Sequence, residues 1–272
     1  MNISRLFVEG IDFLSQLKEN RNVILELTKR DFSSKYIKNI FGLAWSIFDP
    51  LAFIIILYLV FGFRYGHINT LGVPYITYLI TGYISYELFS TTLMAVVNSI
   101  KEYSFLIRKV NFRIAILPIV KILSSLMLHA IIVIIAILLL LVNKIQPSLF
   151  WIQLLYYIFC FVVLITGLAW LTSSINLFFP DIKNIISIIN RVLFFLTPIF
   201  WNIKELPKDI AIIMQFNPLY YIVNGYRDSL LFKTGFWEYP VLTLYFWTLT
   251  FIILIAGILV FKKLRPHFAD VT

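Results

Sequence analysis

The sequence has little charge, few histidines and a single cysteine. Only 14% of its 272 residues are charged, whereas 60% are hydrophobic and the mean hydropathy is +0.89. A chain with this composition does not fold as an ordinary water-soluble domain. The lone Cys160 lies in an apolar run, which excludes an internal disulfide and suggests no redox role. These absences leave an integral membrane protein as the class.

Signatures of covalent chemistry are also missing. The sequence has no G-x-x-x-x-G-K-[ST] phosphate loop and no cluster of metal ligands, and its three histidines are scattered. We therefore expect no catalytic residue, no metal site and no cofactor in this chain. His129 lies within an apolar run, where an ionisable group can mark a functional site. We favour instead a neutral imidazole bonded to a neighbouring helix.

Long apolar runs are what the sequence does contain. A membrane-spanning helix needs about 20 mostly apolar residues, whereas barrel strands would alternate over about ten residues. The runs are continuous, which predicts an all-α bundle. Residues 1–42 form a cytoplasmic amphipathic segment in this interpretation, and residues 43–272 form one transmembrane domain. The six predicted spans are 43–63, 73–97, 114–142, 150–178, 182–201 and 239–261.

Lysine and arginine predict the orientation, because cytoplasmic loops are enriched in them. With the N-terminus inside, 15 of the 23 basic residues fall on the inner side and six on the outer side. Both termini are therefore predicted to be cytoplasmic, and the net charge of +9 requires no nucleic-acid partner. Residues 1–42 have no apolar core long enough for a signal peptide. They lie either on the membrane surface or against the protein's own cytosolic loops.

Acidic residues are scarce inside the predicted spans. Glu87 lies clearly within one, whereas Asp49 and Asp181 lie close to predicted membrane borders. Ion-coupled transporters use intramembrane acidic and histidine side chains, and many show broken helices in matched halves. Neither pattern is evident, so ion-coupled transport is the weaker hypothesis. Transport of a substrate against its gradient would then need energy from a partner protein.

Six stretches occur in a fixed order: KRDFSSKYIKNIFGLAWSIFDPL, TGYISYELF, NSIKEYSFLIRKVNFRIAILP, SSINLFFPDI, LTPIFW and FNPLYYIVNGYRDSLL. Together they resemble the permease subunits of polysaccharide-exporting ABC transporters of the ABC-2 type. The first stretch resembles that family's cytoplasmic entrance motif. The matching positions in the first stretch are Arg30, Asp31, Phe32, Tyr36, Gly42, Trp45, Pro50 and Leu51, and the last stretch contains Asn217, Pro218, Tyr226 and Arg227.

The resemblance implies a homodimer in the bacterial cytoplasmic membrane, completed by two copies of a separate ABC ATPase that binds ATP and Mg. The substrate would be a glycan on a polyprenyl pyrophosphate carrier, of the O-antigen, teichoic acid or capsule type. Residues 98–113 would couple the ATPase to the permease, although an ordinary positive-inside loop remains an alternative. The coupling candidates are Lys101, Glu102, Tyr103, Phe105, Arg108 and Lys109.

Aromatic and polar residues recur at helical spacing in three predicted spans. Aromatic rings pack on the C–H faces of sugars, and a bilayer tolerates charge where it faces a water-filled path or the bundle interior. For Tyr75 and Tyr78 we favour the interfacial aromatic belt. The residues that recur at this spacing are candidates for the wall of a substrate channel. They are Phe41, Trp45, Phe48, Tyr86, Phe89, Ser187, Arg191, Phe194 and Trp201.

Arg191 needs a compensating partner because it is predicted near mid-membrane. Glu87, backbone carbonyls and the diphosphate of a passing substrate all remain open as that partner. Beyond it, residues 202–238 are too long for a turn but contain only short apolar pieces. The resemblance supports two short helices that re-enter the outer leaflet, with a break where Pro218 disfavours helix at Asn217. The remaining alternatives are an ABC-2 exporter of a lipid or drug, an ion-coupled transporter and a polytopic membrane enzyme.

Overall fold

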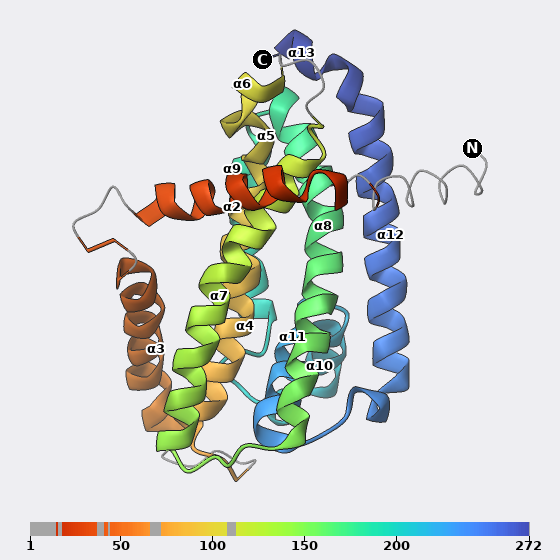
Figure 1. Ribbon diagram of the computed structural model, residues 1–272. Helices are drawn as coiled ribbons and strands as arrows, with labels where there is room; N and C mark the ends of the chain where they lie inside the picture. Colours follow the sequence, from red (N-terminus) through yellow and green to blue (C-terminus); the bar gives the residue numbers. More distant parts are fainter. Residues whose placement is uncertain are drawn as a thin grey trace.

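The computed structural model describes residues 15, 18–36, 41–42, 44–65, 72–107 and 113–271, and every structural statement below concerns these residues. Their regular elements are helices, and the long ones run side by side along one axis (Figure 1). The all-α prediction is thus confirmed for this part of the chain. The helices are α2 Arg21–Tyr36, α3 Ala44–Tyr65, α4 Tyr75–Val97, α5 Ser99–Glu102, α6 Ser104–Ile107, α7 Ile116–Val142, η1 Leu149–Gln153, α8 Leu154–Phe178, α9 Ile182–Leu196, η2 Ile203–Glu205, α10 Lys208–Gln215, α11 Pro218–Arg227, η3 Asp228–Phe232, η4 Phe236–Glu238, α12 Pro240–Leu264, η5 Arg265–His267 and α13 Phe268–Val271.

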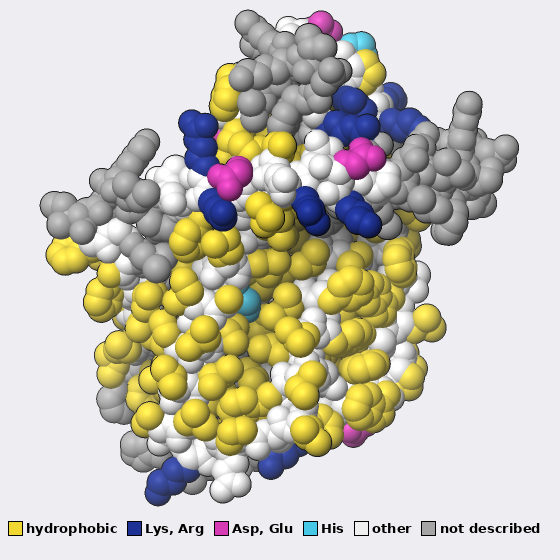
Figure 2. Space-filling view, in the orientation of Figure 1, with side chains coloured by type: hydrophobic (Ala, Val, Ile, Leu, Met, Phe, Trp, Pro, Cys, Tyr) yellow, Lys and Arg dark blue, Asp and Glu magenta, His cyan; other side chains and the backbone are white. Residues whose placement is uncertain are grey.

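Four described helical segments are long and apolar enough to cross a membrane: Ala44–Gly62, Ile116–Val142, Leu149–Phe178 and Pro240–Asp270. Most of their side chains face outward, and Figure 2 shows a broad hydrophobic band between two ends that carry charged groups. In water this exposed apolar surface would be very unfavourable. The chain is therefore a multi-pass membrane protein.

Helix α4, the second predicted span, is the central helix of the bundle. It packs against α3, α7, α8, α9 and α11 and is buried on nearly all sides. It is long enough to cross a membrane but carries tyrosine, threonine and serine, because its neighbours rather than lipid cover it. Tyr75 and Tyr78 are 1% and 4% exposed. The interfacial-belt prediction for these two tyrosines is therefore wrong.

Helix α9, the fifth predicted span, is shorter than expected. It has 15 residues and ends at Leu196 instead of 201. At 1.5 Å per residue it is about 22 Å long, which is less than the ~30 Å hydrocarbon core. Pro198 explains the end, because it disfavours the helical conformation at the preceding residue. Thr197 accordingly adopts an extended backbone, with φ −100° and ψ 131°.

Helices α8 and α12 pack backbone to backbone through two glycines. A Cβ atom on Gly167 would lie 2.7 Å from Leu254 Cα, and one on Gly257 would lie 2.2 Å from the Gly167 carbonyl oxygen. Small residues at crossing points allow membrane helices to approach this closely. The contact fixes α12 against the bundle.

The two ends of the bundle carry different sets of helices. Helices α2, α5, α6 and α13, with the C-terminus, lie toward one end, and α10 and α11 lie in the opposite half (Figure 1). Helix α2 crosses α7, where Ile24 packs on Ile116 and Val120. Helix α11 packs against α4 and α8. Each end therefore has its own set of short helices, and each set carries polar groups considered next.

Candidate functional site

A buried group of charges joins three elements at the α2 end of the bundle. Lys121 of α7 bonds Asp31 of α2 at 2.5 Å and also pairs with Glu102 of α5. Lys35 binds the other Asp31 carboxylate oxygen at 3.1 Å, and the Tyr103 hydroxyl donates to Asp31 at 3.1 Å. We call these five residues the Asp31–Lys121 network. It holds α2 and α5 to the inner part of α7.

Burial makes the Asp31–Lys121 network energetically consequential. The Asp31 and Lys121 side chains are 3% and 6% exposed, and a charge removed from water is tolerated only when it is paired. Burial raises the pKa of Asp31, but the hydrogen bond from Lys121 and the charges of Lys35 and Lys121 outweigh it, so the net pKa is lowered. A lowered folded-state pKa stabilises the protein at neutral pH. That stabilisation is lost only as the pH falls through the folded value.

The network divides the predicted coupling residues into two groups. Glu102 and Tyr103 make contacts within the chain, and the Glu102 side chain is also 50% exposed, so their contact with a partner stays a prediction. Lys101 and Phe105 are exposed. Arg108 and Lys109 lie outside the described residues. In the entrance motif Asp31 is the buried centre of the network and Arg30 is exposed, while the side chain of Tyr36 is not described.

A second buried cation lies in the opposite half of the bundle. Arg227, at the end of α11, is 1% exposed. Its two terminal nitrogens donate to the carbonyls of Pro198 and Ile199, at 2.6 and 2.5 Å. Its guanidinium carbon lies 3.6 Å from the centroid of the Tyr78 ring, which is a cation–π contact. The guanidinium thus binds the backbone directly after the end of α9.

Four consecutive carbonyls after α9 are bonded by side chains from other elements. Arg227 donates to the carbonyl oxygens of Pro198 and Ile199. The Tyr75 hydroxyl donates to the carbonyl oxygen of Phe200 at 2.9 Å, and the Tyr78 hydroxyl donates to that of Trp201 at 3.0 Å. Non-helical backbone at membrane depth is tolerated only when its polar groups are satisfied inside the protein. Arg227, Tyr75 and Tyr78 therefore form what we call the carbonyl clamp, which stabilises the broken end of α9.

The predicted break before α11 is confirmed. Asn217 has an extended backbone, with φ −73° and ψ 119°, and Pro218 is the first helical residue. The Asn217 side chain accepts from the Leu219 amide at 3.0 Å, a standard N-cap, and donates to the Thr197 hydroxyl at 2.8 Å. The same asparagine thus caps α11 and binds the end of α9.

Gly82 is required beside the carbonyl clamp. A Cβ atom there would lie 2.3 Å from Arg227 Nη2 and 3.0 Å from the Ile199 carbonyl oxygen. We expect Gly82→Ala to lower the free energy of unfolding by about 1–3 kcal/mol, the usual cost of overpacking a core. Thermal unfolding in detergent measures this. Gly62→Ala is the matched control, because its Cβ atom would meet only the Tyr58 ring at 3.4 Å. Equal melting temperatures for the two variants would contradict the clamp geometry.

The predicted channel residues differ in how far they are exposed. Tyr86 and Phe89 are each 3% exposed, so these two α4 residues contact other helices and cannot touch a substrate in this arrangement. This corrects their assignment to a channel wall. The others reach the surface of the single chain to differing extents. Phe41, Trp45, Phe48 and Arg191 are exposed, and Ser187, Phe194 and Trp201 are half-buried.

Asn190, rather than Arg191, is the polar residue that α9 buries. Its amide donates to the Ser90 hydroxyl at 2.7 Å, and its side-chain oxygen accepts from Tyr86 at 3.0 Å. Arg191 lies on the exposed side of α9 and forms no ion pair with Glu87. Glu87 accepts instead from the Tyr83 hydroxyl at 3.2 Å. The Glu87 alternative for Arg191 is thus not realised in the described part of the chain.

His129 behaves as a buried structural residue. Its Nε2 atom lies 2.8 Å from the Tyr226 hydroxyl, and both side chains are almost wholly buried. The interpretation as an imidazole bonded to a neighbouring helix is therefore confirmed. The bond joins α7 to α11, and it accounts for Tyr226 of the last motif.

Sequence reasoning missed two roles. Lys121 lies within the predicted span 114–142, where an intramembrane cation is a signal for a partner, but the sequence does not identify that partner. The tyrosines of α4 were judged by their spacing alone. Nothing local in the sequence indicates that Tyr75 and Tyr78 bind carbonyls some 120 residues away.

The chain is similar to known transport proteins over most of its length. The family model described as ABC-2 type transporter matches residues 22–231, which include both buried polar sites. The O-antigen export system permease protein RfbA of Klebsiella pneumoniae is 27% identical over 252 residues, which cover 92% of this chain and 95% of that protein. The polysialic acid transport protein KpsM of Escherichia coli is 24% identical, over 74% of this chain and 78% of that protein.

A more distant relative has the same description. The O-antigen export system permease protein RfbA of Myxococcus xanthus is 21% identical over 80% of this chain and 83% of that protein. The family match covers well over half of the chain and includes the helices that build the Asp31–Lys121 network and the carbonyl clamp. This chain therefore belongs to the ABC-2 type transporter family.

Proposed function

We propose that this chain is the membrane subunit of an ATP-driven exporter that moves a lipid-linked polysaccharide across the bacterial cytoplasmic membrane. The observation that carries the proposal is the similarity over 92% of this chain to a permease named for O-antigen export and over 74% to a protein named for polysialic acid transport. The glycan would be attached to polyprenyl pyrophosphate and would be of the O-antigen, capsule or teichoic acid type. An ABC-2 exporter of a lipid or drug is the second candidate, because the family match alone does not specify the cargo.

Two copies of a separate ABC ATPase, with ATP and Mg, would supply the energy to a homodimer of this chain. The exposed Lys101 and Phe105 lie in α5 and α6, directly beside the Asp31–Lys121 network. Movement of α5 by the ATPase would therefore act on α2 and α7 through Glu102, Lys121 and Asp31. Arg108 and Lys109 belong to the same proposed docking segment.

Six membrane crossings are proposed, with both termini in the cytoplasm. They are the four apolar helical segments together with α4 and α9, which neighbouring helices cover in part. The α10–α11 pair would re-enter the outer leaflet. This is supported by the packing of α11 beside α4 and α8 and by the burial of most of its residues.

Thiol labelling tests this topology. In a Cys160→Ala background, we expect a cysteine at Lys208 to react with an impermeant reagent added to intact cells, because α10 would face outward. A cysteine at Lys262, near the end of α12, should react only after the membrane is opened. Labelling of the Lys262 cysteine in sealed cells would contradict the proposed orientation.

The substrate path is proposed to run along α3 and α9. These helices lie side by side, since the rings of Phe53 and Phe194 are 5.8 Å apart. Their outer faces carry Trp45, Phe48 and Arg191, which are exposed in the single chain. A second copy facing this surface would enclose a conduit with aromatic walls and a cationic group.

We expect Arg191→Leu to leave the permease folded and bound to its ATPase but to reduce polysaccharide export severalfold. The physical reason is that the arginine is exposed and contributes little to the fold, whereas a guanidinium binds diphosphate or sugar oxygens through paired hydrogen bonds. Surface glycan and membrane level of the variant are measured together. Arg191→Lys, which keeps the charge, is the matched control and should retain more export. Normal export by Arg191→Leu would remove this residue from the proposed path.

Co-purification tests the proposed assembly. The tagged permease, extracted in mild detergent, should bring down an ABC ATPase whose hydrolysis rises when a lipid-linked glycan is added. Stimulation by a drug or free lipid, with none by the glycan, would favour the second candidate. Absence of any ATPase would overturn both.

A further inference from the structure

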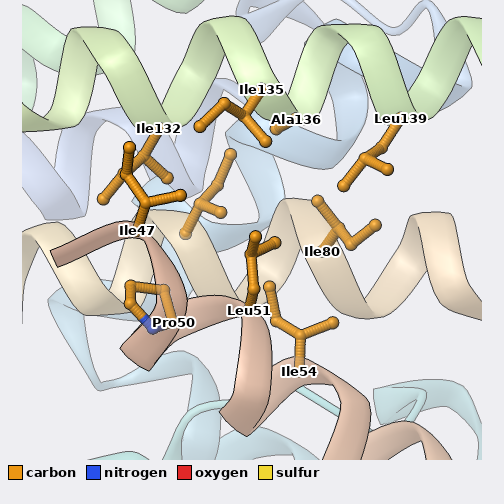
Figure 3. A pocket seen from close by; sticks show the side chains of 10 residues that line it. Ile47, Pro50, Leu51, Ile54, Ile80, Ile132, Ile135, Ala136 and Leu139 are labelled. Carbon is orange, nitrogen blue, oxygen red and sulfur yellow. The ribbon is translucent and has the colours of Figure 1, made fainter. Parts of the chain in front are cut away.

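Two adjoining hollows lie between α3, α4 and α7, just below α2. One is a cavity of about 280 Å³. The other is a shallow hollow of about 20 Å³, which is lined only by apolar residues and shares Pro50 and Ile132 with the first (Figure 3). They therefore form one continuous site with a polar part and an apolar part.

The polar part carries unlike charges. Two carboxylates, Asp49 of α3 and Glu87 of α4, line it together with Lys35 of α2. Hydroxyl groups and the ring of His129 complete the polar lining. The cavity of about 280 Å³ is far larger than the roughly 10–15 Å³ that one water needs, so it has room for a small charged group.

The apolar part continues from it into the bundle. Side chains of α3, α4 and α7 point toward one another across the hollow, as Figure 3 shows. Isoleucine and leucine predominate among them, and Ala136 leaves space on the α7 wall.

The order of the two parts follows the membrane axis. Helix α2 crosses α7 near Val120. Along α7, Ser125 is then about 8 Å and His129 about 14 Å farther in, at 1.5 Å per residue. The apolar lining, from Ile132 to Leu139, is deeper still. The polar part thus lies nearer to α2, and the apolar part lies deeper in the bundle.

The charges select the headgroup. Asp49 and Glu87 would repel a diphosphate, whereas they attract an ammonium group. Lys35 bonds Asp31 and the Ser124 hydroxyl at 3.1 and 3.4 Å, and its third donor is available for a phosphate oxygen. We propose that this site binds a membrane phospholipid with a primary-amine headgroup, its ammonium between Asp49 and Glu87 and an acyl chain lying along the apolar surface of α3, α4 and α7.

The bound lipid would fill the gap between α3 and the rest of the bundle. Helix α3 packs mainly against α4 among the described elements and exposes most of its other faces. A lipid between α3 and α7 adds apolar contact on the side where α3 has little. This role is independent of the exported cargo, because the site would hold a constituent of the bilayer.

Lipid retention tests the proposal. The permease with its ATPase is purified from membranes that contain phosphatidylethanolamine and phosphatidylglycerol, and the lipids that remain after extensive washing are quantified by mass spectrometry. Wild type should retain phosphatidylethanolamine in stoichiometric amount. Asp49→Asn combined with Glu87→Gln should lower its affinity about tenfold, which corresponds to about 1.4 kcal/mol. Asp181→Asn, an exposed acid outside the site, is the control.

A second variant tests lipid binding independently, in case the first variant does not fold. Ala136→Phe fills the apolar part while it keeps both carboxylates, and it should also release the lipid. Ile134→Phe adds the same ring on the outer face of α7, where Ile134 is 59% exposed, and should retain it. Unchanged retention in both site variants would overturn the proposal. So would retention of phosphatidylglycerol, a polyprenyl diphosphate or a second copy of the chain at this site instead.

Discussion

Replacing Arg227 with methionine should leave little folded permease in the membrane. The substitution removes the donors that bind the Pro198 and Ile199 carbonyls, and each unsatisfied buried carbonyl costs about 1–3 kcal/mol. It also removes the cation that stacks on Tyr78. Since the backbone after α9 has these side chains as its partners, we expect the end of α9 and α11 to come apart. Size-exclusion profile, melting temperature and membrane level measure the loss.

Two further variants make the Arg227 result specific. Arg227→Lys keeps a charge but has one donor group, which cannot bind two adjacent carbonyls in the same fork geometry. It should be intermediate in stability. Arg191→Leu removes an arginine from an exposed position of α9 and should melt close to wild type. A stable, monodisperse Arg227→Met protein would contradict the clamp.

Replacing Lys121 with methionine should both destabilise the α2 end and uncouple the permease from its ATPase. Asp31 would keep Lys35 as an ion-pair partner but lose its buried one, so the cost should lie below the roughly 3–5 kcal/mol of leaving a buried charge wholly unpaired. The link from Glu102 of α5 to α7 would be lost as well. ATP hydrolysis should then continue without glycan stimulation, and export should fall to near zero.

The double variant Asp31→Asn with Lys121→Met separates coupling from stability. Removing both charges avoids an uncompensated one, so the double variant should be more stable than Lys121→Met alone. Export should nonetheless remain low, because α2 and α5 are no longer joined through α7. Lys29→Met, which removes only an exposed pair with Glu26, is the control and should change little. If the double variant restores both stability and export, the network has a structural role only.

Much of the fold was predictable because long apolar runs have few alternatives in a bilayer. The starts of α3, α4 and α7 lie within two residues of the predicted 43, 73 and 114. The end of α9 was not predicted, although Pro198 was visible, because apolar residues continue to Trp201 and hydropathy does not register a broken backbone. The early end becomes tolerable only through Arg227, Tyr75 and Tyr78, which lie far away in sequence.

The candidate sites were less predictable, because helical spacing gives a face but not what covers it. Tyr86 and Phe89 share a face with Tyr75 and Tyr78, and all four are buried. The contacts of Glu102 with Lys121 and of Tyr103 with Asp31 were not predicted for the same reason, since their partners lie on other helices. Motif order succeeded where spacing did not: Asn217 and Pro218 begin α11 as expected.

If this permease exports a lipid-linked glycan, that glycan can be followed most directly in cells that lack the permease. Surface polysaccharide should disappear. The completed glycan, still on its polyprenyl pyrophosphate carrier, should accumulate on the cytoplasmic side of the membrane. Wild-type protein supplied on a plasmid should restore the surface glycan, whereas Lys121→Met should not. Unchanged surface polysaccharide in the deletion strain, with no trapped lipid-linked glycan, would contradict the proposed export function.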